Sequence, residues 1–321
     1  MYPYIHIVGN FNIPTYGTLF LIGFIIAVFI GRHIGPSMGI GKDDAFYGML
    51  YCAIGILIGS KVMYFVSKLP NVITNFSAVI EWAKTDFGGL MGYLFGGLVF
   101  YGGLIGAVIG IYRYCYHFRV SFKAFVNVYA PLIPLIHAFG RVGCFLAGCC
   151  YGMEYHGFGA VQFPSPDKFP MFDTDPVLSS VPRLPIQLIE AGLNIIAFII
   201  LWTLTKKRRN KPMQTMGFYL VYYTVARFVL EFFRGDIERG YFGAITTSQW
   251  ISLLLLPIAV ILIRGRWQEK HLNTQDRPLN RRELARREKY KAWYDAQEAK
   301  AAQKKLEQET EAVQEQDSAG E

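Results

Sequence analysis

The chain has 321 residues, of which 52% are apolar, 16% are aromatic and only 17% are charged. Residues 264–321 hold 13 of the 32 Lys and Arg and 12 of the 24 Asp and Glu, so the rest of the chain has roughly half the charge density of a soluble domain. This excludes an ordinary cytosolic enzyme and a disordered protein. The net charge of +8 fits basic membrane loops better than nucleic-acid binding, because no basic, aromatic-interleaved domain is present.

Seven apolar stretches are long enough to cross a bilayer. Their runs are continuous rather than alternating, which favours helices over the strands of a barrel. The expected spans are residues 13–31, 45–66, 89–111, 124–148, 185–204, 216–233 and 242–263. In the third span Gly102, Gly106 and Gly110 recur at a spacing that lets a neighbouring helix approach closely. The sequence therefore predicts an all-α integral membrane protein with seven transmembrane helices.

The distribution of Lys and Arg between the loops predicts the orientation. Successive loops on one side contain 2, 3 and 5 of these residues, and the segments on the other side contain 0, 2, 2 and 2. The positive-inside rule then places the N-terminus outside and the C-terminus in the cytoplasm. The longest outer segment, about residues 149–184, is expected to form a small cap or loop region over the outer membrane face.

The composition also divides the chain into two domains. Residues 1–265 are expected to form the membrane domain, and residues 266–321 a charged cytoplasmic tail. Ala, Glu, Lys, Gln and Arg dominate residues 281–316, which is typical of a solvated helix, here helical or partly disordered. The basic first part of this tail could be attracted to the membrane surface.

Ionisable side chains inside the spans are costly in a bilayer and are candidates for function. These candidates are Lys61, His137, Arg141, Glu190, Arg227 and Glu231, with Arg234 directly after the sixth span. In the predicted orientation all of them except His137 lie at one depth under the outer leaflet. Two glutamates can pair only two of the four Lys and Arg side chains, so the surplus cations predict an anionic ligand such as a phospholipid phosphate.

Structural roles remain open for several of these residues. Arg227 and Glu231 are four residues apart on one helical face, so they can form an internal ion pair. His137 can be a hydrogen-bonded core histidine, and Lys61 can extend to the outer interface.

Two tyrosines extend the candidate set. Tyr16 begins the first span and could belong to an interfacial belt, whereas a tyrosine as deep as Tyr101 needs a polar partner.

The segment GRVGCFLAGCCYG, residues 140–152, resembles the signature of the bacterial prolipoprotein diacylglyceryl transferases, which typically reads GRxGNFxNxExxG. Five other segments resemble family segments and occur in the family order: TYGTLFLIGF, GSKVMYF, YGGLIGA, PIQLIEA and RFVLEFFR. The resemblance covers residues 10–263 and leaves the charged tail outside it. Six segments in order on a seven-helix layout are far more specific than one motif.

The resemblance implies a lipid-modifying transferase of the bacterial inner (plasma) membrane. Its members transfer the diacylglyceryl group of phosphatidylglycerol to the lipobox cysteine thiol in the signal peptide of a preprolipoprotein. A thioether forms and glycerol phosphate is released. By the same resemblance, membrane lipids are partners, nucleic acid is not, and neither a metal nor a soluble cofactor is expected.

The resemblance also suggests residue roles. Tyr101, Arg141 and Arg227 are the expected catalytic residues, the arginines stabilising the head group and leaving group together with Arg234. The other expected substrate-binding positions are Tyr16, Lys61, Gly102, Gly103, Cys144, Gly152, Gln187, Glu190 and Glu231.

This chain departs from the family pattern at several polar positions. Tyr101 stands where the family usually has His, and a phenol with a pKa near 10 is a poorer base at neutral pH than imidazole. Cys144, Ala147 and Cys149 stand at the positions of two Asn and one Glu. The chain is therefore either a divergent transferase with a rebuilt site or a phospholipid-binding paralogue with altered chemistry. A solute transporter fits less well, because no inverted repeat is visible.

The cysteines fall into two groups. Cys52 and Cys115 lie in or beside apolar stretches and are interpreted as small core residues. Cys144, Cys149 and Cys150 form a C-x4-C-C cluster without a fourth ligand at the spacing of a structural zinc site. Packing is the simplest interpretation of these three. A disulfide, a reactive thiol and a metal site remain alternatives, although the geometry of a disulfide disfavours a bond between adjacent Cys149 and Cys150.

Overall fold

The computed structural model describes residues 4–8, 11–163, 181–206, 213–235, 241–243 and 245–264, together with scattered positions between 288 and 303. Contacts divide the chain into two units, residues 1–274 and 275–321. The described positions of the second unit are helical and exposed. The boundary predicted between residues 265 and 266 lies outside the described residues and stays a prediction, as does a continuous tail helix.

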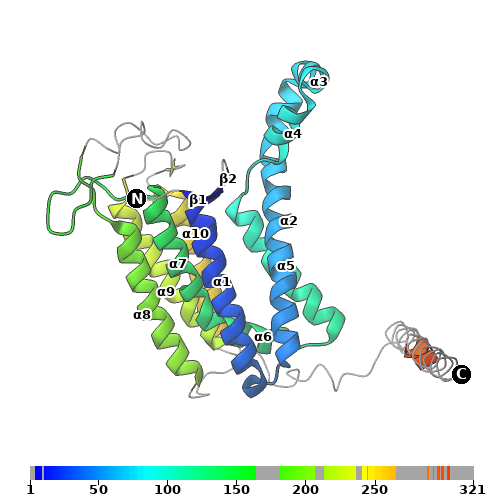
Figure 1. The fold of residues 1–321 in the computed structure, drawn as a ribbon. Coiled ribbons are helices and arrows are strands. Elements are labelled where there is room, and N and C mark those ends of the chain that lie inside the picture. The colour runs from blue at the N-terminus through cyan, green and yellow to red at the C-terminus, as the bar shows by residue number, and fades with distance from the viewer. Residues whose placement is uncertain are drawn as a thin grey trace, which may run out of the picture. The chain divides into compact units, whose positions relative to one another are not determined.

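The described part of the first unit is built from helices that can cross a membrane (Figure 1). Six are long and apolar enough, and a bent pair makes up to seven. The elements are α1 (Thr15–Ile34) with a 3-10 turn (Gly35–Met38), α2 (Lys42–Thr74), α3 (Phe76–Thr85), α4 (Phe87–Phe95), α5 (Phe100–Phe118), α6 (Phe122–Tyr129), a 3-10 turn (Ala130–Leu132), α7 (Ile133–Ala147), α8 (Ile186–Lys206), α9 (Gln214–Leu230) with a 3-10 turn (Glu231–Phe233), and α10 (Thr247–Arg264). The prediction of an all-helical membrane protein is confirmed. Two small hairpins, β1 (Tyr4–Val8) with β2 (Phe11–Pro14) and β3 (Tyr241–Phe242) with β4 (Ile245–Thr246), were not predicted.

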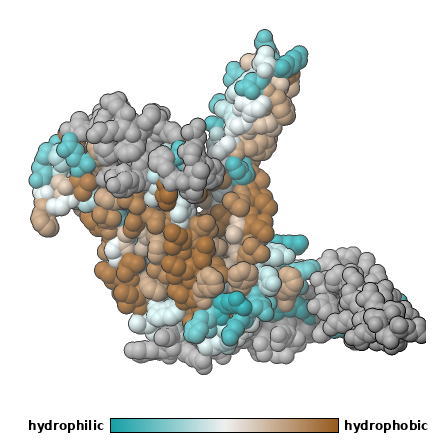
Figure 2. All heavy atoms as spheres, viewed as in Figure 1, coloured by the Kyte–Doolittle hydropathy of each residue, from teal (hydrophilic) through white to brown (hydrophobic). Residues whose placement is uncertain are grey.

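Large apolar side chains cover the outward faces of these helices. Phe29, Leu57 and Leu254 are each more than half exposed, at 61%, 59% and 69%. Figure 2 shows a broad hydrophobic band across the helices with hydrophilic residues beyond it at both ends. Contiguous apolar surface of this kind is rare on soluble monomers and is the surface that a bilayer covers.

The third predicted span, residues 89–111, falls on a bent pair of helices. It is broken between α4 and α5, whose axes differ in direction by 71°. A side chain on Gly97 would lie 2.2 Å from the ring of Tyr64, so the break packs closely against α2. The Val99 N–H donates to the Ser60 carbonyl at 3.3 Å, and the Lys61 ammonium donates to the carbonyl of Phe95, where α4 ends.

Glycines bring α2 and α5 into backbone contact, as their spacing predicted. A Cβ atom on Gly106 would lie 2.0 Å from the Gly55 carbonyl oxygen, and one on Gly102 would lie 2.3 Å from that of Gly59. No side chain larger than hydrogen fits at these positions without moving backbone. The α2–α5 pair is therefore fixed in register by the absence of side chains.

Helix α6 and the 3-10 turn before α7 contribute to the main hydrophobic core of the described residues. Phe125 and Leu132 are fully buried, and Cys52 and Cys115 belong to the same cluster, which confirms their interpretation as core residues. Proline at residues 131 and 134 accounts for the short 3-10 turn between the two helices.

At the other end of α7, close packing against α1 places the candidate site. A Cβ atom on Gly143 would lie 2.9 Å from the Cα atom of Tyr16, and one on Gly23 would lie 2.8 Å from the Cβ atom of Phe139. The C-terminal end of α7 therefore lies beside the N-terminal end of α1.

Helix α2 extends further at its C-terminal end than predicted. It continues to Thr74, and α3 and α4 fold back onto it. An open pocket of about 420 Å³ lies between these three helices, lined by residues such as Asn71, Trp82 and Tyr93. It contains none of the residues predicted for the functional site.

Candidate active site

Two adjacent helices, α7 and α8, hold a buried ion pair. Arg141 Nη2 lies 2.8 Å from Glu190 Oε1, and the two side chains are only 11% and 6% exposed. His137 lies one turn before Arg141 on α7, and its Nε2 atom is 3.3 Å from the same carboxylate oxygen. A residue interpreted from the sequence as a core histidine is thus a neighbour of the site.

A second buried pair joins α9 to its terminal turn. Arg227 Nη2 lies 3.1 Å from Glu231 Oε2, which is the internal pairing that their spacing allows. The same nitrogen donates to Ser248 Oγ on α10, also at 3.1 Å. Arg227 is therefore held between two helices, with its side chain 12% exposed.

Each of these two arginines retains a buried N–H group without an acceptor. Arg141 Nε and Arg227 Nη1 have no hydrogen-bond partner among the residues that the structure describes. A buried donor left unsatisfied costs about 1–3 kcal/mol, and more when it is charged. With Arg234, the group carries three positive and two negative charges when His137 is neutral. Geometry and charge both favour an anion here.

Arg234 reaches this end of the helices through backbone pairing. It pairs with Gly152 in an antiparallel bridge, flanked by hydrogen bonds from Met153 N to Phe233 O at 2.9 Å and from Gly235 N to Tyr151 O at 3.1 Å. A Cβ atom on Gly152 would lie 2.4 Å from the Leu184 carbonyl oxygen. Only glycine fits at residue 152 without moving backbone, because the chain at Leu184 approaches too closely for a side chain.

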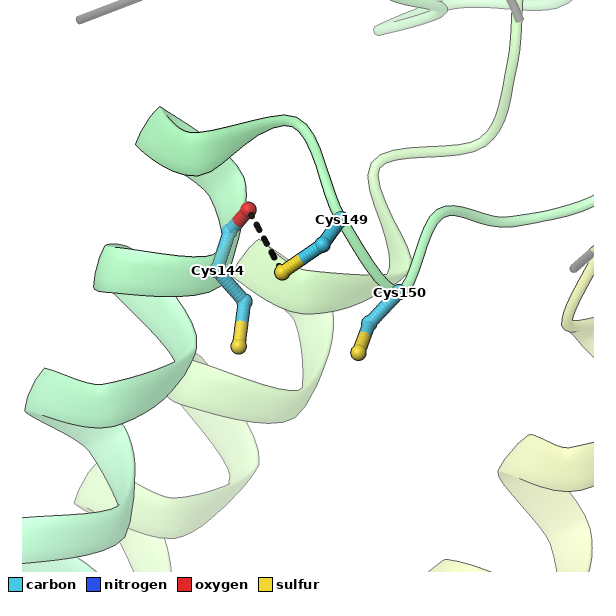
Figure 3. Close-up of side chains that lie close together, drawn as sticks. All are labelled: Cys144, Cys149 and Cys150. Atoms are coloured by element: carbon cyan, nitrogen blue, oxygen red, sulfur yellow. Dashed lines mark hydrogen bonds between the residues drawn. The ribbon is translucent and has the colours of Figure 1, made fainter. Parts of the chain in front are cut away.

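The turn that ends α7 brings three thiols together (Figure 3). Gly148 adopts a left-handed conformation with φ of 77°, and its N–H donates to Phe145 O while the Cys149 N–H donates to Cys144 O. This Schellman motif folds the chain back over the last helical turn. The sulfur atoms of Cys144, Cys149 and Cys150 lie within 4.8 Å of one another, and all are free thiols.

The turn that carries Cys149 and Cys150 is hydrogen-bonded to α8. Gln187 is fully buried and its Nε2 donates to the Cys149 carbonyl at 2.8 Å. Cys150 has a φ of 57°, a conformation that costs a residue with a side chain on the order of 1 kcal/mol. The Cys149 thiol donates to the Cys144 carbonyl oxygen at 3.7 Å. The neighbouring thiols of Cys144 and Cys149, and then the charges of Arg234 and Arg141, lower the pKa of Cys150 against the effect of burial.

The predicted site residues fall into two groups in the structure. The arginines, glutamates, Gln187, Gly152 and Cys144 gather around the ends of α7, α8 and α9, with Tyr16 beside them on α1. Lys61, Tyr101, Gly102 and Gly103 lie on the α2–α5 pair. Tyr101 is 45% exposed. No hydrogen bond or ion pair connects Lys61 or Tyr101 to the arginines in the described part of the chain.

Sequence reasoning missed several residues near this site, among them Ser248 and Arg183. Ser248 accepts a hydrogen bond from Arg227. In the sequence, it is marked only by the polar residues that begin the otherwise apolar α10. Arg183 is buried, lies over the ring of Tyr151 at 4.6 Å, and its Nη1 is 3.5 Å from the Gly152 carbonyl. Its signal is a lone arginine two residues before the apolar run that begins at Pro185.

Comparisons with known proteins place the chain in a family. A family model described as prolipoprotein diacylglyceryl transferase matches residues 3–264. A phosphatidylglycerol–prolipoprotein diacylglyceryl transferase of Clostridium tetani is 30% identical over 267 residues, covering 82% of this chain and 96% of the relative. One of Xanthomonas euvesicatoria is 30% identical over 275 residues, covering 79% and 88%. A Clostridium perfringens protein with the same name and the number 2 is 29% identical over 251 residues, covering 78% and 90%. The chain is therefore a multi-pass membrane protein that belongs to the prolipoprotein diacylglyceryl transferase family of lipoprotein biosynthesis.

Proposed function

We propose that this protein transfers the diacylglyceryl group of phosphatidylglycerol to the lipobox cysteine thiol of a preprolipoprotein. The observation that carries the proposal is the pair of buried arginines on α7 and α9, each with an unsatisfied N–H donor. Both belong to segments that match the family model, and relatives that share about 30% of the sequence are named for this reaction. The lipid phosphate is the anion that these donors would bind.

Arg141 and Arg227 are placed to stabilise the phosphate that leaves during the transfer. The thiolate sulfur attacks the glyceryl carbon, a carbon–sulfur bond forms, and the carbon–oxygen bond to phosphate breaks. The electron pair leaves with glycerol phosphate, whose phosphate gains negative charge. Arg141 and Arg227, already oriented by Glu190 and Glu231, stabilise that charge with little further rearrangement. The thiol proton is lost before or during attack, and the cationic surroundings favour the thiolate.

The orientation follows from the same proposal. The arginines lie at the end where α1, α8 and α10 begin and α7 and α9 end. With the N-terminus outside, as the basic loops predict, this end faces the outer leaflet, where a lipid donor and a translocated signal peptide can both reach it. The C-terminus then lies in the cytoplasm.

The transfer reaction can be tested directly. Purified full-length protein is incubated with phosphatidylglycerol in mixed micelles and a lipobox peptide, and the thioether product is detected by mass spectrometry. We expect product from the wild type and none from Arg141→Ala or Arg227→Ala. Arg32→Ala is the matched control, because Arg32 is 45% exposed and its one ion pair with a described residue is to Asp43 at 3.5 Å. No product from the wild type, while another family member works under the same conditions, would overturn the proposal.

A second candidate is a phospholipid-binding paralogue without transferase activity. Tyr101 favours it, because the phenol replaces the family's usual histidine and is 45% exposed on α5 without a hydrogen bond to the described residues. This candidate predicts that phosphatidylglycerol binds to the wild type and is lost in Arg141→Ala, while no peptide is modified. Measuring lipid binding and product formation on the same preparation separates the two functions.

A further inference from the structure

Three cysteine thiols converge at the end of α7, next to the arginines. Their sulfur atoms lie within 4.8 Å of one another, although the sequence alone offers only a C-x4-C-C spacing (Figure 3). A tetrahedral zinc with Zn–S bonds of about 2.3 Å separates its sulfur ligands by about 3.8 Å. Movements of less than about 1 Å would therefore bring these thiols to the geometry of three zinc ligands.

The backbone around the thiols is specialised beyond the needs of packing. Cys150 is held in the left-handed region, at a φ of 57°, where a residue with a side chain is strained. Gln187, fully buried, uses its amide to fix the Cys149 carbonyl. The conformation in which the three sulfur atoms meet is strained at Cys150 and is supported by a buried hydrogen bond at Cys149. Two of the thiols also stand where the family signature has Asn and Glu.

The charges nearby fit a metal bound by three thiolates. Three thiolates and one Zn²⁺ carry a net charge of −1, and a fourth thiolate makes it −2. Arg141 and Arg234 are both close enough to Cys150 to act on it electrostatically, so they would compensate this negative charge. The three thiols are the only group of three or more Cys, His, Asp or Glu with metal-binding spacing in the described residues. Among the described residues, these three ligands leave one position of a tetrahedral zinc site open.

We propose that Cys144, Cys149 and Cys150 bind a zinc ion whose fourth ligand is the thiolate of the acceptor peptide. Catalytic zinc sites characteristically combine three protein ligands with one position for substrate. This inference rests on the proposed function, because it assigns the metal to the same acceptor thiol.

The chemistry balances without a redox step. The peptide thiol releases its proton to solvent when its sulfur binds zinc, since coordination deprotonates a thiol. The sulfur then forms its bond to the glyceryl carbon, and the carbon–oxygen bond breaks with its electron pair going to glycerol phosphate. The thioether is neutral and a weaker ligand than thiolate, so the product leaves the metal. Zinc would thus supply the thiol activation for which Tyr101 is poorly suited.

The test uses cobalt(II) as a spectroscopic substitute for zinc. Full-length protein is purified in detergent, reduced, stripped with a chelator and titrated anaerobically with cobalt(II), followed by competition with zinc(II). We expect one cobalt per chain, a thiolate-to-cobalt charge-transfer band, and displacement by zinc. Adding a lipobox peptide should change the cobalt d–d bands, whereas the same peptide with Ser in place of Cys should not.

Five matched variants identify the ligands. Cys144→Ala, Cys149→Ala and Cys150→Ala should each weaken cobalt binding by at least about tenfold, the lower end of the loss seen when even a supporting partner of a metal ligand is removed. Cys52→Ala and Cys115→Ala remove buried thiols from the core at the other end of the helices and should leave cobalt binding unchanged. Melting temperature in detergent shows that each variant is folded.

The outcomes separate this inference from the proposed function. If the wild type gives no charge-transfer band, or if the triple Cys→Ala variant keeps it, there is no metal site at these thiols. If cobalt binds but the peptide thiol leaves its spectrum unchanged, the fourth-ligand role is overturned. If the metal-stripped enzyme forms thioether at the full rate, the fourth-ligand role is overturned while the transferase stands. If the peptide thiol changes the spectrum but no thioether forms, the metal site stands and the transferase does not.

Discussion

Arg141 on α7 and Glu190 on α8 form an ion pair of 2.8 Å in which both side chains are almost completely buried. Removing one partner from such a pair leaves the other charge uncompensated, at a cost of about 3–5 kcal/mol. Glu190→Gln preserves the shape of the side chain and removes only the charge. We expect it to lower the melting temperature in detergent by several degrees and to reduce product formation.

Glu154→Gln is the matched control for that prediction. Glu154 also pairs with one partner, His156, at 2.9 Å, but both side chains are more than half exposed. Its substitution should cost no more than about 1 kcal/mol. Equal melting temperatures for the two variants would show that the Arg141–Glu190 pair contributes nothing particular to stability.

The fork of the Arg227 guanidinium, and not only its charge, is expected to matter. One nitrogen contacts Glu231 and Ser248, which leaves Nη1 directed elsewhere. Lysine keeps the charge but presents a single ammonium, so Arg227→Lys should lower the rate of thioether formation by about 10²-fold. Arg32→Lys, at an exposed position, should leave the rate unchanged. Full activity of Arg227→Lys would mean that charge alone is sufficient.

Substituting Tyr101 is expected to change the rate of transfer but to have little effect on the free energy of unfolding. Its side chain is 45% exposed, so Tyr101→His and Tyr101→Phe should change the free energy of unfolding by no more than about 0.5 kcal/mol. Transfer should be preserved or raised in Tyr101→His and lowered in Tyr101→Phe. A collapse of the rate in Tyr101→His would instead show a site rebuilt around the phenol. Tyr112→His, at an exposed position on the same helix, controls for a general effect on α5.

The glycine contact between α2 and α5 makes a prediction about folding. A Cβ atom on Gly106 would meet the Gly55 carbonyl at 2.0 Å, so Gly106→Ala must move backbone and should destabilise the protein by about 1–3 kcal/mol. A Cβ atom added to Gly92 on α4 would have no neighbouring atom within 4 Å, so Gly92→Ala should be neutral or slightly stabilising. Thermal unfolding in detergent checks both, and a stable Gly106→Ala would contradict the backbone contact.

The sequence predicted the features that depend on local composition. Apolar runs indicated the spans, rare ionisable residues such as Arg141 and Glu190 indicated the candidate site, and glycine spacing indicated that a neighbouring helix packs closely against α5. It could not predict which glutamate pairs with which arginine across helices. Glu190 meets Arg141 because α8 packs on α7, and neither helix specifies that packing by itself.

The broken third span and the thiol cluster escaped prediction for a related reason. At the break, Gly97 packs against the ring of Tyr64, which lies 33 residues earlier in the chain. The three sulfur atoms meet because Gly148 and Cys150 both adopt positive φ. Glycine at residue 148 was a visible signal of a helix end, but a left-handed cysteine was not.

The hydrogen bond from Gln187 to the Cys149 carbonyl bears on how this branch of the family could have diverged. It holds the turn through main-chain atoms, as do the bonds that Gly148 and Cys149 donate to the last turn of α7. Among the side chains at residues 144, 149 and 150, only the Cys149 thiol is itself hydrogen-bonded to the main chain of this turn in the described residues, at 3.7 Å from the Cys144 carbonyl oxygen. Successive substitutions there can exchange amide and carboxylate for thiol while the scaffold of the neighbouring arginines is inherited unchanged.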